Sequence, residues 1–497
     1  MPDTSQVSGP ADPELWELTR VAVHAAGAAA DAHLTPNGWR PRVALASVDA
    51  FDSGWPNITS TRLFPNDDSP TEFSALFGPK KDQLKPIEYS DVPELAALIA
   101  YVRDRDDLHS RLRVTSASGR GDLEERMFEF EVADLPLSLL DRARATGAVS
   151  DDELFALYLE RERAWLLDPL PVEYVIPLAL TALSLDRTLV IDETTRIEVL
   201  DDKMQAARAP SSLSQNAVPN AVVGAATHAL VLCGHQISNP GPADRLFGRG
   251  VEELPLDDAD LVCEALRVVT DVAVGYAQIL RRPLGWADTW TYDLPPLDTI
   301  ETVRRYPDWY DNYGWLRVPE PIPMEELSRL PAVASALRTA PSRIRLAARR
   351  LSTASLRVAE DDRTVDACIG LEALLGEGRD ELSHRIALRA ATALATRDDA
   401  AADPHVIYRL VKKVYDHRSA VVHGTEGGRT RRITFGDVTY DADRIAVILL
   451  RELLLDVLTR SGGWTPQSLD ADLLNSLGPA ELPGDTRVEL EPSRRRS

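Results

Sequence analysis

The sequence predicts a mainly α-helical fold in which a C-terminal helical bundle follows a mixed α+β N-terminal region. Apolar residues recur at helical spacing in successive segments of residues 323–462, which predicts the bundle. Short β-favouring runs and a loop rich in Trp and Pro occupy residues 171–322. Residues 1–170 form a mixed module to which the sequence assigns no role. We expect the Pro-rich tail, residues 463–497, to be disordered.

Local signals place individual elements in the first two regions. Helices are predicted at Pro93–Arg103 and Ser150–Leu167, the second with Ser150 as its N-cap and acidic residues in its first turn. The β-favouring runs Leu189–Ile191 and Ile197–Leu200 are separated by D-E-T-T, which is typical of a hairpin. These signals indicate both helices and strands before the bundle.

Three apolar or aromatic segments complete this part of the chain. Residues Ala221–Gly234 are apolar apart from Thr227 and His228 and shorter than the roughly 20 residues of a membrane span, so they predict a buried strand or a core helix. Leu256–Leu280 has the apolar spacing of a helix. Pro283–Pro321 is dense in Trp, Tyr and Pro; such aromatic residues anchor a loop-rich surface more often than they stack on bases.

Five helices are predicted in the bundle. The first follows Ser342, the third begins at Ser383, and the fourth carries Ile407, Val411 and Val414 on one side. The second and the last span Thr364–Leu375 and Asp443–Arg460. Because the last helix is apolar almost all round, we expect it to be the most buried.

Composition limits the class of protein. The chain has 55 Lys and Arg residues against 78 Asp and Glu residues, a formal net charge of −23, which excludes a protein whose whole surface coats nucleic acid or an anionic membrane. Cys233, Cys263 and Cys368 form neither a zinc spacing nor a disulfide framework, as is typical of a reducing cytosol. The N-terminus lacks the pattern of a signal peptide. We expect a cytoplasmic protein without membrane contact, metal or other cofactor.

Common catalytic motifs are missing from the sequence. It contains no G-x4-G-K-[ST], no H-E-x-x-H and no G-x-S-x-G, the usual marks of nucleotide hydrolysis, zinc proteolysis and esterase chemistry. The run Gly248-x-Gly250-x-x-Glu253 lacks the third glycine of a dinucleotide site and ends in an acid. Cys233 lies in an apolar run, where a buried structural thiol is the usual case.

The strongest chemical signal is an arginine followed closely by a histidine. The spacing alone does not distinguish a functional pair from a chance one, so the surrounding residues decide. Three pairs have this spacing, about the number that random placement gives: Arg103–His109, Arg379–His384 and Arg418–His423. The first two contain or adjoin acidic residues that would repel phosphate. The third ends an amphipathic helix within residues 405–432, which hold seven basic and two acidic residues. A second basic stretch, residues 327–359, has seven arginines and no acid. Charge alone leaves open a solvated basic face or a polyanion site.

Three segments in this order resemble a known family. They are D-A-C-I-G-L-E-A-L-L-G from Asp366, S-H-R-I-A-L-R-A-A-T-A-L from Ser383, and Y-D-H-R-S-A-V-V-H-G from Tyr415. Together they resemble the successive helices of an Apea-like HEPN domain, over about residues 324–461. The resemblance implies a bundle of four to five helices and metal-independent RNA cleavage at a homodimer interface, in a toxin or antiphage defence effector. It also implies an antitoxin or regulatory protein as a further partner.

The residue types suit that chemistry. Attack of a ribose 2′-OH on its neighbouring phosphate needs a proton acceptor, a proton donor and a cation for the phosphorane. Histidine serves acid or base roles near neutral pH, and arginine offers a charged planar fork to phosphate oxygens. His423 is the candidate acid/base and Arg418 the candidate phosphorane-stabilising group. One histidine does not easily do both jobs, which favours two copies across a two-fold axis. The alternative is a non-catalytic HEPN module for RNA binding or protein assembly.

Neighbouring residues have weaker predictions. Ser419, His417, Lys412 and Lys413 are candidate substrate-binding residues, although an exposed neutral role is the commoner one for His417. Tyr415 is expected to pack inside the bundle. Glu372 lies in an apolar helix and needs a cation, for which Arg389 is the natural candidate. On a straight helix Arg418 and His423 point about 140° apart, so they converge only if the helix bends or a second subunit completes the site. Gly424 allows the helix to end just after His423.

Overall fold

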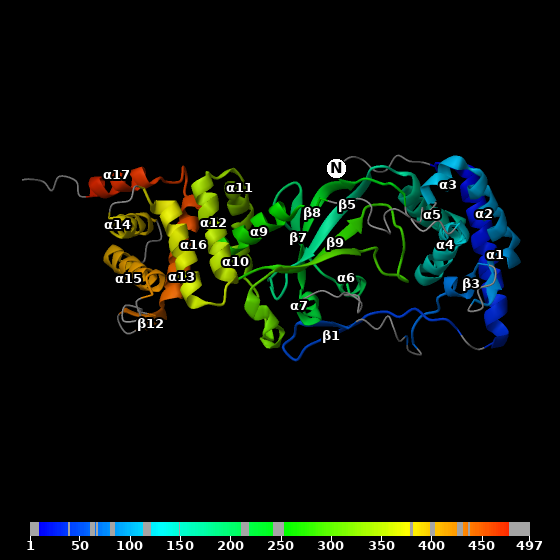
Figure 1. Cartoon of the computed structure of the whole chain (residues 1–497), viewed down its shortest axis with the longest axis horizontal. Coiled ribbons are helices and arrows are strands. Elements are labelled where there is room, and N and C mark those ends of the chain that lie inside the picture. The colour runs from blue at the N-terminus through cyan, green and yellow to red at the C-terminus, as the bar shows by residue number, and fades with distance from the viewer. Residues whose placement is uncertain are drawn as a thin grey trace, which may run out of the picture. The chain divides into compact units, whose positions relative to one another are not determined.

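The structure is a computed structural model, and its contacts group the chain into two compact units. The first unit comprises residues 1–263 and 274–328, and the second comprises residues 264–273 and 329–497. Helices dominate, and the first unit adds a six-stranded sheet, which confirms a mainly α fold with some β structure (Figure 1). The structure describes residues 9–37, 40–59, 65, 68–79, 85–112, 121–148, 150–209, 218–241, 253–377, 381–397, 403–424, 431–435 and 438–476.

The first unit begins with a group of helices that share one apolar core. They are α1 (Pro13–Asn37), α2 (Pro93–Asp104), α3 (Asp106–Leu112), α4 (Gly121–Thr146) and α5 (Asp151–Leu166). The two helices predicted before residue 170 are confirmed as α2 and α5. Ser150 caps α5 as predicted, because its side chain accepts a hydrogen bond from the backbone N–H of Glu153.

Short elements connect these helices. Two small sheets pair β1 (Ser47–Ala50) with β2 (Pro56–Thr59) and β3 (Phe77–Gly78) with β4 (Ile87–Glu88). Two single turns of 3-10 helix, η1 (Ser74–Leu76) and η2 (Tyr89–Asp91), precede β3 and α2. Asp141 of α4 holds η1 by accepting the backbone N–H groups of Phe73 and Ser74 at 2.7 and 3.2 Å.

An antiparallel sheet forms the middle of the first unit. Its strands are β5 (Leu170–Pro177), β6 (Leu189–Val190), β7 (Thr195–Val199), β8 (His228–Ile237), β9 (Tyr276–Pro283) and β10 (Asp298–Arg305), in the order β10-β9-β5-β8-β7-β6. The predicted hairpin is confirmed, since Leu189 of β6 pairs with Ile197 of β7. Helices α6 (Asp202–Ala207) and α7 (Asn220–Gly224) precede β8, so the apolar run Ala221–Gly234 contains both a helix and a strand.

One predicted helix is wrong in its second half. Helix α9 (Leu256–Val269) ends where Thr270 turns its hydroxyl back onto the carbonyl of Leu266, and the chain then enters β9. Gly275 permits this entry, because a Cβ there would overlap the backbone of Arg305 on β10. Residues 276–280 therefore pair with neighbouring strands, although their apolar spacing alone also fits a helix.

The aromatic segment anchors a surface rich in loops and short turns, as predicted. Trp286 is fully buried and donates its indole N–H to the carbonyl of Pro171 at 2.7 Å. Tyr306 and Tyr310 are buried beside Trp309 in a small apolar cluster. Two 3-10 turns, η3 (Asp308–Asp311) and η4 (Gly314–Leu316), and the short helix α10 (Met324–Leu327) end the first unit.

The second unit is a helical bundle with a small hairpin. Its elements are α11 (Leu330–Thr339), α12 (Ser342–Leu356), α13 (Glu360–Leu375), α14 (Leu382–Ala395), α15 (Pro404–Val422), β11 (Arg432–Phe435), β12 (Val438–Asp441), α16 (Ala442–Thr459) and α17 (Pro466–Ser476). The five predicted bundle helices correspond to α12–α16. As expected, α16 is buried on most of its sides. Gly370 lets α13 approach α16 closely, because a Cβ there would overlap Leu450.

The expected disordered tail is wrong for its first part. Residues 466–476 form α17, which packs beside α14 and buries Leu469 completely (Figure 1). The buried guanidinium of Arg389 binds the carboxylate of Asp470 on α17 at 2.6 and 2.8 Å and the carbonyl of Leu375 at 2.6 Å. The polar sequence of α17 gave no apolar stripe to predict it, because the helix is attached by the Arg389–Asp470 ion pair, the buried residues Pro466 and Leu469, and a hydrogen bond from Gln467 to Glu377. Residues 477–497 lie outside the described residues.

One of the two predicted domain boundaries lies close to the division between the units, and the other does not. The boundary expected after residue 322 lies a few residues before the change of unit at Arg329. The boundary expected at residue 170 falls at the first residue of β5, within the first unit.

Candidate functional site

Helix α15 (Pro404–Val422) carries the residues of the predicted site except His423, which is its C-cap. Asp403 caps it by accepting the backbone N–H of His405 at 2.8 Å, and Pro404 occupies the first helical position, where no N–H is needed. Ile407, Val411 and Val414 are buried, and α15 packs against α13, α14 and α16. At the other end, Gly424 takes a φ of +67°, which ends the helix as predicted.

Arg418 lies on the side of α15 that faces α13. Its Nη2 atom is 3.6 Å from Oε1 of Glu372, and both side chains are partly exposed. The prediction that Arg389 pairs with Glu372 is therefore wrong: Arg389 binds Asp470 instead. One turn before Arg418, Tyr415 packs inside the bundle as expected and donates its hydroxyl to the carbonyl of Cys368 at 3.4 Å.

Cys368 is not a competing nucleophile beside Arg418. Burial raises the pKa of its thiol to about 12, and the nearby charge of Arg418 lowers it only in part. The thiol is therefore protonated at neutral pH. Arg418 is left as the charged group on this side of α15 that can contact an anion.

His423 lies at the end of α15 and is exposed. Its backbone N–H still donates to the carbonyl of Ser419 at 3.0 Å, so the residue follows the helix path (φ −89°, ψ 0°). His423 lies five positions after Arg418, which turns the two side chains about 140° apart on a helix. Within one chain, Arg418 contacts α13 whereas His423 is open to solvent.

His417 does not have the exposed position expected for it. Its side chain is 2% exposed, and Nε2 lies 3.7 Å from Oδ1 of Asp361 in the first turn of α13. Position 417 is on the side of α15 that packs on the bundle, which a helical-wheel count relative to Val414 and Ala420 could have shown. His417 contacts the bundle, so a role in contacting substrate needs a movement of this side chain.

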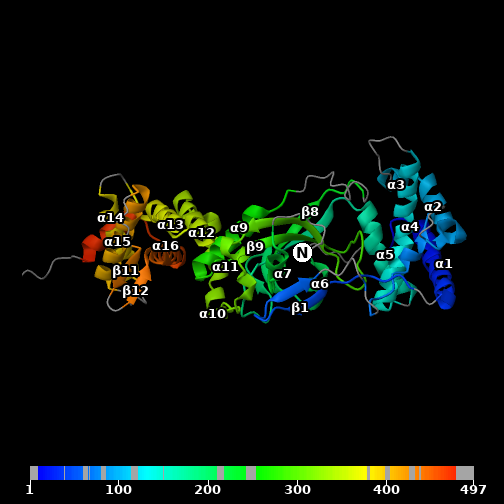
Figure 2. The ribbon, with the colours of Figure 1, turned by 60° about the horizontal axis from the view of Figure 1, so that its bottom comes forward.

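The other predicted binding residues lie on the outer side of α15. Ser419 is exposed. Lys412 donates from Nζ to the hydroxyl of Ser383 at 2.9 Å, and Lys413 donates to the carbonyl of Thr434 at 3.3 Å. The β11–β12 hairpin that carries Thr434 lies beside α15 and α16 (Figure 2). These side chains, together with exposed His423, form a polar surface along α15.

One cluster on this surface escaped sequence reasoning. His384 of α14 and Tyr408 of α15 join through Nδ1 and the phenol oxygen at 2.9 Å, next to the Ser383–Lys412 contact. The two rings meet edge to face with centroids 5.8 Å apart. Twenty-four residues separate His384 from Tyr408, so no local spacing signals their contact.

The two basic stretches differ in how their charges are used. In residues 327–359, Arg350 and Arg357 bind the buried carboxylate of Asp366 at 2.8 Å each, and Arg343 donates to the carbonyl of Trp464. Part of this arginine excess therefore holds the bundle together. In the second stretch, Arg418 and Arg432 lie 3.6 and 3.7 Å from the carboxylates of Glu372 and Asp441, whereas Lys412 and Lys413 donate to a hydroxyl and a carbonyl. Residues 425–430 of this stretch lie outside the described residues.

The two Arg–His pairs that were set aside have other surroundings. Arg103 binds the carboxylates of Glu125 and Glu129, and His109 lies edge to face on Phe128. This pair joins α2 and α3 to α4, which accounts for its residues structurally. In the other pair, Arg379 lies outside the described residues.

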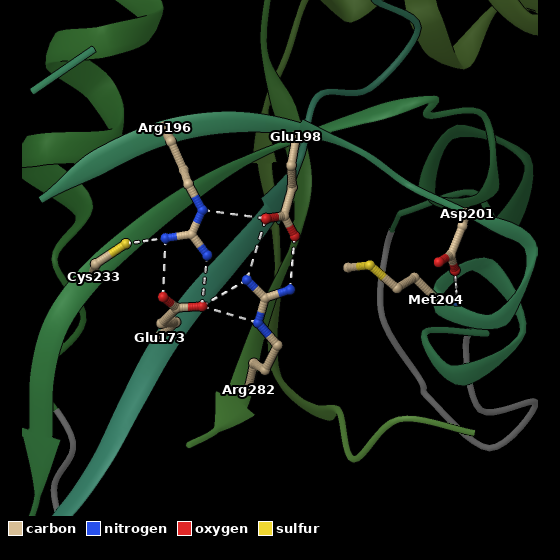
Figure 3. A network of polar contacts seen from close by, with 7 residues as sticks. All are labelled: Glu173, Arg196, Glu198, Asp201, Met204, Cys233 and Arg282. Atoms are coloured by element: carbon tan, nitrogen blue, oxygen red, sulfur yellow. Dashed lines mark hydrogen bonds and ion pairs between the residues drawn. The ribbon is translucent and has the colours of Figure 1, made fainter. Parts of the chain in front are cut away.

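A second polar cluster lies on one face of the sheet (Figure 3). Glu173 of β5 binds Arg196 of β7 at 2.9 Å and Arg282 of β9 at 2.6 Å, and Glu198 of β7 binds the same two arginines at 3.3 and 2.7 Å. Burial pushes the pKa of Glu173 upwards, but the hydrogen bonds and charges of the two arginines outweigh it and hold the pKa below its ordinary value. Two carboxylates balance two guanidiniums, so the cluster ties strands together.

Cys233 contacts this cluster through Arg196 (Figure 3). Burial and, to a smaller extent, the charge of Glu173 raise the pKa of its thiol to about 11, so the thiol is protonated at neutral pH. The sequence predicted a buried structural thiol, whereas Cys233 is half-buried and contacts Arg196 of the sheet cluster.

Within the described residues, no group of three or more His, Cys, Asp or Glu side chains is placed to hold a metal ion. No helix among them combines the length and apolar character needed to cross a bilayer.

Comparison of the chain with protein families, with curated proteins and with solved structures found no match.

Proposed function

We propose that this chain is a metal-independent endoribonuclease of the HEPN type, in which Arg418 and His423 act at the interface of a homodimer. The observation that carries the proposal is the end of α15, which combines a partly exposed guanidinium and an exposed imidazole with the polar surface formed by Ser419, Lys412 and Lys413. An imidazole that moves protons and a guanidinium that stays charged are the two groups that RNA transesterification requires.

The reaction follows from these groups. His423 accepts the proton of a ribose 2′-OH as its oxygen attacks the adjacent phosphorus, and Arg418 stabilises the charge of the phosphorane. The His423 of a second copy donates a proton to the departing 5′ oxygen. The bond between phosphorus and that oxygen breaks, which leaves a 2′,3′-cyclic phosphate on one fragment and a 5′-hydroxyl on the other.

The need for a second copy comes from the geometry of α15. Arg418 and His423 point about 140° apart, and Arg418 contacts Glu372, so one chain does not bring both groups to one phosphate. Two copies related by a two-fold axis supply two imidazoles and two guanidiniums to a shared cleft. The proposal therefore ties activity to dimerisation. A toxin or defence role, with a regulatory protein or antitoxin that restrains it, accompanies the proposal.

A second function is favoured by one observation. The ion pair between Arg418 and Glu372 gives Arg418 a structural partner, as expected of a non-catalytic module that binds RNA or assembles with other proteins. Such a module would bind RNA without cleaving it, and His423 would have no catalytic role.

The ends of the RNA fragments distinguish the two functions. Purified protein is incubated with a defined RNA in EDTA, and the fragments are analysed by mass spectrometry. The proposal expects 2′,3′-cyclic phosphate and 5′-hydroxyl ends. Intact RNA under conditions where the protein binds it tightly supports the non-catalytic function, and 3′-hydroxyl with 5′-phosphate ends contradicts the mechanism.

Dependence on protein concentration tests the dimer. Below the dissociation constant of the dimer, specific activity should fall as the protein is diluted, because only paired chains are active. Light scattering at each concentration gives the oligomeric state. Specific activity that stays constant while the protein dissociates to monomers contradicts the two-copy site.

A further inference from the structure

Ser383, His384 and Tyr408 have no role in the proposed reaction, and they surround Lys412, which belongs to the polar surface of the proposed site. Ser383 and His384 lie in the first turn of α14, and Tyr408 and Lys412 lie one turn apart on α15. The four side chains are linked in two pairs, by the His384–Tyr408 and Lys412–Ser383 hydrogen bonds at 2.9 Å each. We call this group the α14–α15 surface.

We propose that the α14–α15 surface binds an unpaired nucleotide of a single-stranded RNA that reaches the site at His423. This inference rests on the proposed ribonuclease function and deepens it, because it assigns a base-binding subsite on α14 and α15 to the same site. Proteins that bind single strands combine aromatic rings, on which bases stack, with cations that follow the phosphates. The α14–α15 surface contains both kinds of group.

The aromatic pair supplies a stacking platform. His384 is exposed and Tyr408 is partly buried, and their rings lie at 83° to each other. Their hydrogen bond fixes this arrangement before any ligand arrives, which reduces the entropy that stacking costs. Stacking tolerates any base, so the platform selects an unpaired base and not a particular sequence.

The polar pair supplies phosphate contacts. The ammonium of Lys412 has three N–H donors and uses one for Ser383. Because the hydroxyl of Ser383 is the acceptor in that bond, its own hydrogen is left to donate. Lys412 and Ser383 can therefore both donate to the oxygens of one phosphate while the hydrogen bond between these two side chains stays intact.

Continuity with the proposed site comes from helix geometry. Tyr408, Lys412, Ser419 and His423 follow one another at steps of four, seven and four residues, which places them on one side of α15. From Tyr408 to His423 the helix rises about 22 Å, the length of roughly six stacked nucleotides. Asp416 is an exposed acid on this side, and Lys413 lies beside it.

The test is binding of an RNA that cannot react. A fluorescent 12-nucleotide RNA with 2′-O-methyl groups has no 2′-OH nucleophile, so its affinity for the full-length protein is measured by anisotropy without cleavage. Tyr408→Ala should weaken binding by about 5- to 100-fold, the usual range for loss of one stacked base. Tyr408→Phe, which keeps the ring, should stay within about 3-fold of wild type.

Controls separate this inference from folding effects and from the nuclease proposal. Arg345→Ala removes an exposed cation from α12 and should leave the affinity unchanged. If Tyr408→Ala alters the melting temperature, Lys412→Gln tests the same surface. The slope of log affinity against log salt concentration should then become shallower by about the amount that one phosphate contact contributes. Unchanged affinity in Tyr408→Ala and an unchanged salt slope in Lys412→Gln overturn the inference, as does equal binding of duplex RNA. Cleavage of unmodified RNA in EDTA, measured in parallel, decides the nuclease proposal separately.

Discussion

The guanidinium of Arg418 lies 3.6 Å from the carboxylate of Glu372, so an ion pair joins α15 to α13 at the candidate site. Both side chains are partly exposed, and such pairs contribute little to stability. In the proposed reaction this pair would fix the direction of the Arg418 guanidinium, which makes Glu372 the expected positioning residue for Arg418.

Replacement of Glu372 should therefore affect turnover more than folding. Glu372→Gln removes the charge that orients Arg418 and leaves the guanidinium with its full attraction for phosphate. We expect kcat to fall about 10-fold, with KM unchanged or lower, because binding and orientation are affected in opposite directions. Unfolding free energy should change by less than about 1 kcal/mol.

Steady-state kinetics and thermal melting provide these quantities. Asp362→Asn is the control, because Asp362 is an exposed acid on the same helix and pairs with Arg357. A Glu372→Gln enzyme with wild-type kcat and a raised KM would show that Glu372 has no positioning role.

The attachment of α17 depends on one ion pair with a buried partner. Asp470→Ala leaves the guanidinium of Arg389 buried without its carboxylate, which should cost about 2 kcal/mol and release α17 from α14. Hydrogen exchange should then be faster in residues 466–476. The hydrogen bond from Arg389 lowers the pKa of Asp470, so this contribution is present above the ordinary pKa and is lost as pH falls.

Two variants make this prediction specific. Asp472→Ala changes an exposed acid of the same helix and should leave exchange unchanged. Replacement of both Arg389 and Asp470 by leucine should restore part of the stability, because no charge is then left buried. Equal exchange in Asp470→Ala and wild type would mean that apolar contacts alone hold α17.

The sheet cluster should be sensitive to loss of its most buried carboxylate. Glu173→Gln leaves Arg196 and Arg282 with one carboxylate between them, and we expect a loss of about 3 kcal/mol in chemical denaturation. Glu193→Gln, an exposed acid before β7, is the control and should cost less than about 0.5 kcal/mol. Similar losses in the two variants would show that the cluster is not stabilising.

Asp141 gives a stability change with pH of the opposite sign to that of Asp470. Burial raises its pKa to about 6, and the N–H groups of Ser74 and Phe73 lower it only in part. Between about pH 4 and 6 the folded state therefore holds more protons than the unfolded state, so the free energy of unfolding falls as pH rises, by up to about 3 kcal/mol.

The Asp141→Asn variant should remove this slope, because the amide oxygen still accepts the two N–H groups but carries no charge. Urea denaturation at about pH 4, 5, 6 and 7 gives the slope of the free energy of unfolding against pH. Asp152→Asn, an exposed acid of α5, should keep the wild-type slope. An unchanged slope in Asp141→Asn would contradict a raised pKa at this position.

Elements whose signals are local could be predicted from the sequence. Ser150 and its first-turn acids identify the start of α5, and apolar residues at helical spacing identify the core of α15. The end of α15 was also predictable, because Gly424 takes a positive φ that few other residues adopt.

Features that depend on distant contacts could not be predicted. Residues 276–280 have helical spacing, but pairing with β5 and β10 makes them a strand. The partner of Glu372 is Arg418 and not Arg389, because Asp470 of an unpredicted helix takes Arg389. The burial of His417 and the contact of His384 with Tyr408 also arise only when α13, α14 and α15 pack together.

The most direct test of the central claim is the rate of RNA cleavage in EDTA by His423→Ala. We expect kcat/KM to fall by about 100-fold or more while the melting temperature stays unchanged, because an exposed side chain that supports catalysis contributes little to folding. His24→Ala, which removes an exposed histidine from α1, should cleave as wild type does. Equal cleavage by His423→Ala and wild type would contradict the assignment of His423 as the acid/base residue.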